Sequence, residues 1–379
     1  MEKKNILLLV PSLGIGGQER IAVNTASCLT TSYNVYILTF QRLGKEYDTT
    51  CQRFNLNLPA TSNSVFRIFQ QFRRALKIRA FCKEYHIDCL ISFGKTANLS
   101  SVLSTVFTRR KTIVTIHGFA EVYRGIINSF IFSHANRVVC ISNDMQFRLL
   151  QLYPHMNNCS VINNGYDISE HVYNKKQNRK NDYFLNIVGM GRLEYVKGFD
   201  RLIKAFAKFH SRIPRSHLTI IGEGSERPNL ENLVYKNQLE DCITFCGYLQ
   251  DPYTELMKNE VFVLSSRNEG FPNAIIEALA CRLCVISVDC LTGPREILLG
   301  KYTPEPVRGI KIGEYGILVE NAKNENSIVS LLSDACLYLI NNPDLRKLYC
   351  ENGPQRCLDF SLSRYATQFD VLIKSLIEQ

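Results

Sequence analysis

Residues 186–206, NIVGMGRLEYVKGFDRLIKAF, contain the unit from which the fold class can be predicted. The apolar run at 186–190 shows no alternation with polar residues, which is typical of a strand buried on both faces. A loop with glycines follows, and from Phe199 onward apolar residues recur three or four positions apart, which indicates a helix. A buried strand, a loop and an amphipathic helix are the repeating unit of a parallel α/β sheet.

Nine further apolar runs repeat this pattern, with helical stretches between them. They are ILLLV (6–10), VYILTF (35–40), CLISF (89–93), TIVTI (112–116), VVCIS (138–142), LTIIG (218–222), ITFCG (243–247), VFVLS (261–265) and CVISV (284–288). Because the alternation occurs in both halves of the chain, we predict an α/β protein with two doubly wound, Rossmann-like domains built on parallel sheets.

Length and composition agree with two globular domains. The 379 residues exceed one typical domain, and 45% hydrophobic with 21% charged residues is usual for a soluble protein. No apolar run is long enough for a transmembrane helix, and the short run at 6–10 is better explained by a strand than by a signal peptide. The polar stretch at 171–182 predicts a linker, so we expect an N-terminal domain at 1–175 and a C-terminal domain at 176–360.

Cysteine spacing and charge indicate a reduced protein with one basic half. The fourteen cysteines have no regular spacing, which favours free thiols in a cytosolic protein. Buried thiols explain the C-x-x-C at 281–284 and the C-x3-C at 242–246 better than zinc ligands do. Residues 1–170 hold 19 Lys and Arg against 10 Asp and Glu, whereas residues 171–379 hold 26 against 25. The N-terminal half is therefore expected to meet an anionic surface or partner.

A glycine-rich loop follows the first strand. Gly14, Gly16 and Gly17 precede a helical pattern that includes Ile21. Glycines allow a ligand to approach the backbone, and a helix N-terminus attracts anions. The loop matches neither a dinucleotide fingerprint, because Glu19 replaces the third glycine, nor a Walker A motif. A purely structural turn is the alternative interpretation.

Two cations lie in the loop of the opening stretch. Arg192 and Lys197 are five positions apart, between a strand and the start of a helix. An arginine fork and a lysine ammonium at a helix start are suited to bind a diphosphate. Two solvated surface charges are the alternative interpretation.

Two glutamates stand eight positions apart in SSRNEGFPNAIIEALA, residues 265–280. Pro272 suits the first turn of a helix, which places Glu269 in the loop before the helix and Glu277 in its second turn. The N–H groups of the helix start can receive an anion, and the two carboxylates can accept hydrogen bonds from hydroxyls on either side of it. A sugar, a diphosphate and a ribose in series have this layout, although Glu277 is also compatible with a solvated helix acid.

The ordered set of motifs resembles a family-4 retaining glycosyltransferase of the GT-B fold, of the type that builds bacterial capsule or O-antigen. The resemblance runs nearly end to end. It is carried by GGQER (16–20), TIHG (115–118), CISNDM (140–145), VINNGYD (161–167), GMGRLEYVKGFDRLIKAF (189–206), IIGEGSERPNLENL (220–233), ITFCGYLQDPYTELM (243–257), Glu-x7-Glu (269–277) and GPREIL (293–298). It implies that two domains face a central cleft and that a C-terminal helix at 361–379 crosses back to the N-terminal domain.

The resemblance also implies a role for each motif residue. Catalysis would fall to His117, Arg192, Lys197 and Glu269, with His117 beside the sugar and the acceptor. Donor binding would use Gly16 and Gly17 against the diphosphate, Arg192 and Lys197 as its counter-charges, Glu269 for the sugar, Glu277 for the ribose, Tyr248 and Leu249 for the base, and the backbone of Gly270, Phe271, Asn273 and Ala274. A structural role for a single histidine after a strand is the alternative for His117.

The implied reaction transfers a sugar from a nucleotide-diphosphate donor, a UDP-sugar, to a hydroxyl of a polyprenyl-diphosphate-linked glycan. No cofactor and no metal are expected, because the two cations serve the diphosphate and no D-x-D motif occurs. A GT-B-fold nucleotide-sugar epimerase and a non-catalytic nucleotide-sugar-binding protein are the alternatives. We expect no nucleic-acid partner, because the basic charge comes with no recognised RNA- or DNA-binding motif.

Residues 65–81, VFRIFQQFRRALKIRAF, combine five basic residues and no acid with apolar residues three or four apart. Phe66, Phe69, Phe72, Leu76 and Ala80 form that apolar stripe. A basic amphipathic helix of this kind favours attachment to an anionic membrane, so we expect a cytoplasmic protein peripheral to the inner membrane. The alternative is a helix that turns the stripe towards the core. The segment 300–313 is longer than expected, and no role is predicted for it.

Overall fold

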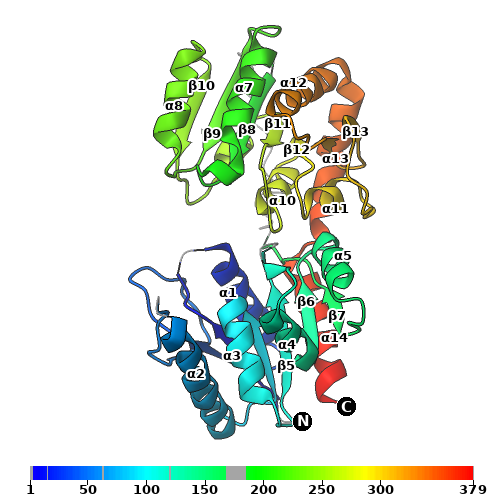
Figure 1. The fold of residues 1–379 in the computed structure, drawn as a ribbon. Helices are drawn as coiled ribbons and strands as arrows, with labels where there is room; N and C mark the ends of the chain where they lie inside the picture. The colour runs from blue at the N-terminus through cyan, green and yellow to red at the C-terminus, as the bar shows by residue number, and fades with distance from the viewer. Residues whose placement is uncertain (1–2, 15, 62–63, 119–120, 168–184, 379) are drawn as a thin grey trace. The chain divides into compact units, whose positions relative to one another are not determined.

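The structure is a computed structural model that describes residues 3–14, 16–61, 64–118, 121–167 and 185–378. The chain forms two compact units (Figure 1). Unit 1 contains residues 1–166 and 360–379, and unit 2 contains residues 167–359. The predicted linker at 171–182 and the predicted boundary at 175 lie outside the described residues.

Unit 1 is built on a seven-stranded parallel sheet of order β3-β2-β1-β4-β5-β6-β7. Its strands are β1 (Asn5–Val10), β2 (Asn34–Thr39), β3 (Gln52–Asn55), β4 (Cys89–Phe93), β5 (Lys111–Ile116), β6 (Arg137–Cys140) and β7 (Cys159–Val161). Its helices are α1 (Gly17–Leu29), α2 (Ser64–Glu84), α3 (Lys95–Thr105), α4 (Ile126–His134), α5 (Asn143–Leu152) and α14 (Leu362–Ile377).

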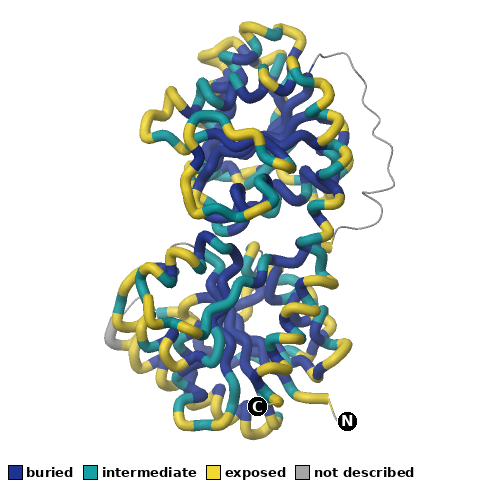
Figure 2. The backbone as a smooth tube through the Cα atoms, turned by 90° about the vertical axis from the view of Figure 1, so that its right-hand side faces the viewer, coloured by how far each residue is buried: buried dark blue, intermediate teal, exposed yellow. Residues whose placement is uncertain are grey.

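Alternating residues of β1 serve two separate cores, one on each face of this sheet. Ile6, Leu8 and Val10 pack with residues of α1 and α14. Leu7 and Leu9 pack on the other face with residues of α2 and α3. Because both faces are covered, the strand needs apolar residues at every position, which explains its continuous run. Figure 2 shows the central strands among the buried residues.

The last helix, α14, returns to unit 1 and packs against α1. The hydroxyls of Tyr365 and Thr25 lie 2.6 Å apart in the interior. Tyr33 donates a hydrogen bond of 2.7 Å to Asp370. These contacts join the two ends of the chain within one unit.

Unit 2 has a seven-stranded sheet of order β10-β9-β8-β11-β12-β14-β13. Its strands are β8 (Leu185–Met190), β9 (Ser216–Ile221), β10 (Ile243–Gly247), β11 (Val261–Leu264), β12 (Cys284–Val288), β13 (Ile310–Ile312) and β14 (Ile317–Val319). Its helices are α7 (Phe199–His210), α8 (Arg227–Lys236), α9 (Tyr253–Leu256), α10 (Asn273–Ala280), α11 (Pro294–Leu298), α12 (Glu325–Asn341) and α13 (Pro343–Leu358), with the 3₁₀ turn η2 (Tyr195–Lys197).

The predicted fold class is confirmed, and all ten predicted strands are present. The four strands that were not predicted, β3, β7, β13 and β14, are only three or four residues long. The expectation of purely parallel sheets is wrong at one edge, because β13 runs antiparallel to β14. A short hairpin between them permits this direction, whereas parallel neighbours need a crossover. No helix among the described residues combines the length and hydropathy needed to cross a bilayer.

Candidate functional site

The residues predicted to bind a ligand lie in loops that follow strands, at the carboxyl edge of each sheet. In unit 2 these loops follow β8, β10 and β11, three strands of one sheet. In unit 1 they follow β1 and β5. Ligands of open α/β sheets bind beyond this edge, so the topology gathers the predicted residues of each unit at a place suited to binding.

Lys197 and Glu269 form an ion pair in unit 2. The Lys197 ammonium lies 2.7 Å from each oxygen of the Glu269 carboxylate. The two side chains are 23% and 8% exposed, so the charges are largely withdrawn from water. Ser266 donates a further hydrogen bond of 2.7 Å to the same carboxylate, and the Thr292 hydroxyl donates to the Glu269 carbonyl. The sequence predicted that Lys197 binds the diphosphate and Glu269 the sugar, whereas the fold places the two charges in contact with one another.

Backbone contacts on two sides hold the loop that carries Lys197. The Leu193 N–H donates to the Glu223 carbonyl at 2.9 Å, and the Arg267 N–H donates to the Val196 carbonyl at 2.8 Å. Gly198 has φ 65°, and a Cβ there would lie 2.2 Å from the Ser265 carbonyl oxygen. Only glycine satisfies both the left-handed backbone and this close approach.

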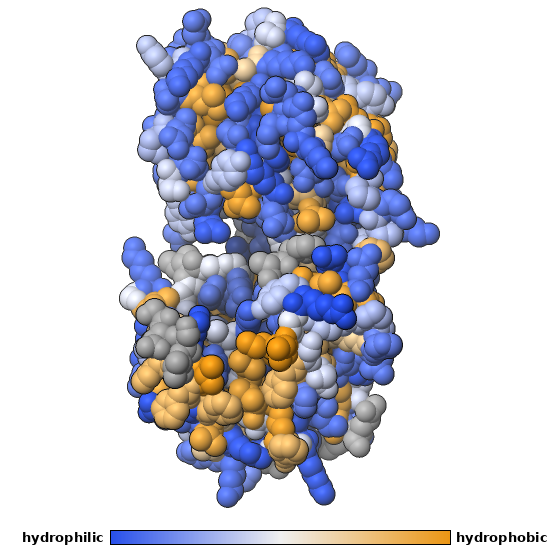
Figure 3. All heavy atoms as spheres, in the orientation of Figure 1, coloured by the Kyte–Doolittle hydropathy of each residue, from blue (hydrophilic) through white to orange (hydrophobic). Residues whose placement is uncertain are grey.

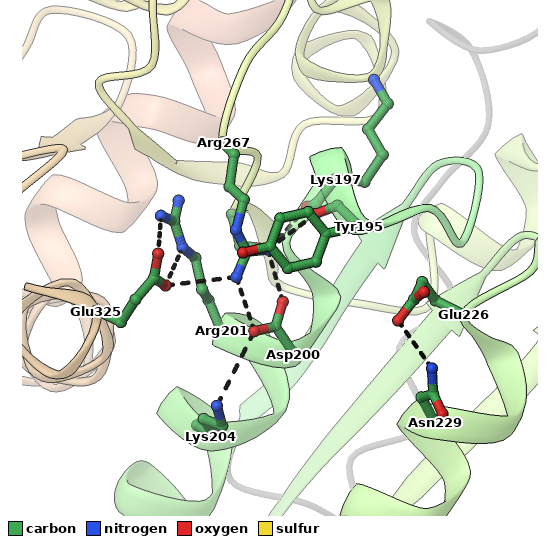
Figure 4. A network of polar contacts seen from close by, with 10 residues as sticks. Tyr195, Lys197, Asp200, Arg201, Lys204, Glu226, Asn229, Arg267 and Glu325 are labelled. Carbon is green, nitrogen blue, oxygen red and sulfur yellow. Dashed lines mark hydrogen bonds and ion pairs between the residues drawn. The ribbon is translucent and has the colours of Figure 1, made fainter. Parts of the chain in front are cut away.

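Arg267 is a residue of this region that sequence reasoning missed. Its guanidinium lies 3.9 Å from the centre of the Tyr195 ring and donates to the Tyr195 carbonyl at 2.8 Å. It also donates to both oxygens of Asp200, at 2.7 and 2.9 Å (Figure 4). Burial raises the pKa of Asp200, but the hydrogen bond and charge of Arg267 outweigh it and hold that pKa below its usual range.

The Arg267 network fixes the turn from which Lys197 projects. Next to it, Arg201 donates to both oxygens of Glu325 at 2.6 Å. In Figure 4 the Lys197 side chain extends away from these ion pairs. Arg267 stands two residues before Glu269, so the network joins both loops of the Lys197–Glu269 pair. Its partners are more than 50 positions distant in the chain, and no local pattern identifies them.

The other predicted residues of unit 2 are distributed around the same sheet edge. Arg192 is exposed, and its side chain makes no hydrogen bond or ion pair with a described residue. Tyr248 is 73% exposed after β10, and Leu249 is partly exposed. Gly270, Ala274 and Glu277 are partly exposed, whereas Phe271 is buried.

Helix α10 begins one residue later than predicted. Pro272 is its N-cap residue and Asn273 its first residue, so Glu277 lies in the second turn as expected. The Asn273 N–H donates to the Phe271 carbonyl at 3.0 Å. One of the four backbone groups expected to face a ligand is therefore engaged within the loop.

Gly16 and Gly17 begin α1 at the carboxyl edge of the unit 1 sheet. Gly16 is the N-cap residue in an extended conformation, φ −156°. A Cβ on Gly16 would lie 2.3 Å from a carboxylate oxygen of Glu19, which is the end of a flexible side chain. A Cβ on Gly17 would meet nothing within 4 Å. The fold of unit 1 therefore gives no steric reason for glycine at position 17.

His117 follows β5 and is held as a neutral ring. Burial lowers the pKa of His117 to about 4. The ring stacks on Phe93, and its Nε2 lies 2.8 Å from the Thr115 hydroxyl. Thr115 donates its own proton to the Ser92 carbonyl at 2.7 Å. Nε2 must therefore carry the hydrogen that His117 donates to Thr115, which leaves Nδ1 as an acceptor.

Glu121 is a second residue that the sequence reading missed. Its carboxylate accepts hydrogen bonds of 3.0 Å from the backbone N–H groups of His117 and Gly118. Burial raises the pKa of Glu121, and these two hydrogen bonds oppose that rise. Glu121 thus fixes the backbone beside His117.

Comparison with protein families accounts for both units. Residues 173–356 match the family model described as "Glycosyl transferases group 1", and residues 15–170 match "Glycosyltransferase Family 4". The two matches meet near the division between the units.

Individual relatives extend over most of the chain. It is 28% identical over 357 residues to an uncharacterized glycosyltransferase of Methanocaldococcus jannaschii, with 84% of this chain and 86% of that protein covered. It is 26% identical over 382 residues to the N-acetylgalactosamine-N,N'-diacetylbacillosaminyl-diphospho-undecaprenol 4-alpha-N-acetylgalactosaminyltransferase of Campylobacter jejuni, with 97% and 98% covered. The crystal structure of Anabaena HepE in complex with UDP is similar in fold, with TM-score 0.76, 17% identity and 98% and 100% coverage.

Proposed function

We propose that this chain transfers a sugar from a UDP-sugar to a lipid-linked glycan. The premise is that it belongs to glycosyltransferase family 4 and is a glycosyltransferase with the GT-B fold. The observation that carries the proposal is the Lys197–Glu269 pair at the carboxyl edge of the unit 2 sheet. A lysine suited to a phosphate and a carboxylate suited to a hydroxyl meet there, next to the start of α10. HepE, which shares the fold, binds UDP.

The donor would be held by groups of complementary chemistry. Lys197 has three N–H donors, so it can bind a phosphate oxygen while it keeps one contact with Glu269. Arg192 would supply the second charge. The exposed ring of Tyr248, with Leu249, would pack on the base, and Glu277 would accept from the ribose hydroxyls. The backbone of Gly270, Phe271, Asn273 and Ala274 would face the sugar and the phosphates. We propose the diphosphate as the ligand of Gly16 and Gly17 as well.

The proposed reaction retains the anomeric configuration by front-face displacement. The bond from the anomeric carbon to the phosphate oxygen breaks, the acceptor oxygen bonds to the same face, and the departing phosphate oxygen takes the acceptor's proton. Lys197 and Arg192 stabilise the charge that grows on this oxygen. Glu269 is bound to Lys197 and Ser266, which supports a role in holding the sugar rather than as a nucleophile. The free Nδ1 of His117 would accept a hydrogen bond from a sugar hydroxyl.

A polyprenyl-diphosphate-linked glycan is the proposed acceptor. The name of the Campylobacter jejuni relative specifies a diphospho-undecaprenol-linked acceptor. The excess of basic residues in the first 170 positions supports activity at an anionic membrane surface. The enzyme would then act in surface-polysaccharide biosynthesis, such as that of O-antigen or capsule, at the cytoplasmic face of the inner membrane.

A panel of nucleotide sugars, each supplied with and without an undecaprenyl-diphosphate-linked disaccharide, tests the proposal. We expect one UDP-sugar to release UDP in the presence of the acceptor, and NMR of the product to show the anomeric configuration of the donor. Conversion of the donor into an isomer without acceptor would instead identify an epimerase. Donor binding without turnover of any acceptor would favour a non-catalytic binding protein.

Gly17→Ala distinguishes a ligand-facing glycine from a structural one. The added methyl meets no atom of unit 1, so the thermal midpoint should stay equal or rise slightly, as alanine favours a helix. If a diphosphate packs on Gly17, the methyl should weaken UDP binding about tenfold or more, because overpacking a tight contact costs about 1–3 kcal/mol. Calorimetric titration with UDP measures this effect.

Gly44→Ala is the matched control, since a Cβ there also meets nothing within 4 Å. Its affinity for UDP should equal that of the wild type. Equal affinities for all three proteins would show that Gly17 does not approach the donor.

A further inference from the structure

Helix α2 turns its apolar stripe outward. Four members of the stripe are large and exposed: Phe66 at 53%, Phe69 at 56%, Phe72 at 54% and Leu76 at 66%. Ile68 is exposed as well, at 64%. Figure 3 shows apolar side chains gathered on this part of unit 1. The alternative of a core-facing stripe is therefore wrong.

Polar side chains on the opposite face of α2 hold the helix in this orientation. Arg74, which is 3% exposed, donates to the carbonyls of Leu58 and Pro59 and lies 4.2 Å from the ring centre of Phe40. Gln71 accepts a hydrogen bond of 2.6 Å from Ser100 on α3. Rotating the helix to bury the stripe would break all of these hydrogen bonds, so the outward stripe is a specified feature of the fold.

Basic side chains flank the stripe on the exposed surface. Arg73, Lys77, Arg79 and Lys83 are exposed, and Glu84 is the only acid of the helix. With about 3.6 residues per turn, Arg73 and Lys77 lie to one side of the line through Phe69 and Leu76, and Arg79 lies to the other. An apolar line between two basic edges is the pattern of a helix that lies in a bilayer interface.

The turn between α3 and β5 adds an aromatic tip and more positive charge next to the end of α2. Phe107 is 98% exposed, with φ 61°. Arg109, Arg110 and Lys111 line a hollow of about 570 Å³ with it, and their side chains make no ion pair with a described carboxylate. Helix α3, which ends at this turn, packs against α2, and the Lys111 N–H donates to the carbonyl of Asp88, four residues after the end of α2, at 3.2 Å, so the turn lies close to the end of α2.

We propose that the outward face of α2, together with the Phe107 turn, is a docking surface for an anionic phospholipid bilayer, with the apolar stripe in the interface and the flanking cations against lipid phosphates. Docking would bring the enzyme to a lipid-linked acceptor, and this consequence rests on the proposed function. Charge complementarity selects the bilayer as occupant: a second copy of this chain would bring an equally basic face against it.

Vesicle sedimentation of the full-length protein tests the surface without any substrate. Vesicles of phosphatidylethanolamine with about 30% phosphatidylglycerol should bind the wild type, and neutral phosphatidylcholine vesicles or high salt should release it. The variant F69S/L76S should bind at least tenfold more weakly. The variant R73Q/K77Q should lose on the order of fivefold per cation.

Y235S/V371S is the matched control, because it also removes two apolar side chains that are more than half exposed, on α8 and α14. It should bind vesicles like the wild type. Circular dichroism and thermal midpoints of all variants verify folding, which these exposed positions should not disturb. Equal binding of F69S/L76S and the control to anionic vesicles would overturn the proposal. Failure of the wild type to bind anionic vesicles would overturn it as well.

Two further measurements separate this inference from the proposed function. Sedimentation velocity would reveal a dimer that F69S/L76S dissociates, and such a dimer without lipid binding would assign the surface to a second copy instead. Turnover of a short, water-soluble acceptor should be the same for F69S/L76S and the wild type. If the wild type transfers sugar but binds no vesicles, the proposed docking surface is refuted and the proposed transferase activity is not.

Discussion

Lys197→Ala should lower the rate of sugar transfer about 10²–10³-fold, the effect of removing one preorganised group that stabilises developing charge. In the structure the ammonium is anchored 2.7 Å from both oxygens of Glu269, in a loop fixed from two sides. It is thus already positioned before the phosphate oxygen becomes negative. The substitution also leaves the carboxylate, 8% exposed, without its counter-ion. Turnover at saturating donor and acceptor is the quantity to measure.

Lys204→Ala is the matched control for this experiment. Lys204 lies in the same unit, on α7, but its side chain is 48% exposed and its ion pair with Asp200 spans 4.0 Å. Such a surface pair contributes little, so turnover should not change. Near wild-type turnover of Lys197→Ala would refute the role of Lys197. A loss of activity matched by unfolding at the assay temperature would reduce that role to a structural one.

Arg295→Met should lower the free energy of unfolding of unit 2 by about 3–5 kcal/mol, the cost of removing one partner from a buried ion pair. Arg295 lies 2.8 Å from Asp289, and the two side chains are 4% and 2% exposed. Arg295 also donates to the carbonyls of Thr303 and Pro304, while Asp289 accepts from the Val307 N–H. The pair therefore anchors the long segment before β13, for which the sequence predicted no role.

Urea denaturation followed by circular dichroism measures the Arg295 effect. Arg308→Met is the control, because Arg308 belongs to the same segment but is 83% exposed in its ion pair with Glu320. It should change stability by no more than about 0.5 kcal/mol. A midpoint for Arg295→Met that equals that of Arg308→Met would contradict the anchoring role.

Local sequence patterns were sufficient to predict the architecture and to assign the candidate residues to loops that follow strands. A strand covered on both faces needs apolar residues throughout, so β1 and β8 can each be recognised from an apolar run of five or six residues. The carboxyl ends of parallel strands share one edge, so Arg192, Glu269 and Tyr248 could be assigned to that edge from strand order alone. Short edge strands such as β3 and β13 carry no such pattern, because none of their residues is buried.

Which side chains meet was decided by the tertiary structure. Lys197 and Glu269 are 72 positions apart, and their contact depends on how the loops after β8 and β11 approach one another. The stripe of α2 fits a core or a bilayer equally well by its spacing. Carbonyls and a hydroxyl from distant segments satisfy Arg74 and Gln71 and so turn the stripe outward. Periodicity determines that a helix has two faces, but the hydrogen-bond partners available in the folded chain determine which face is buried.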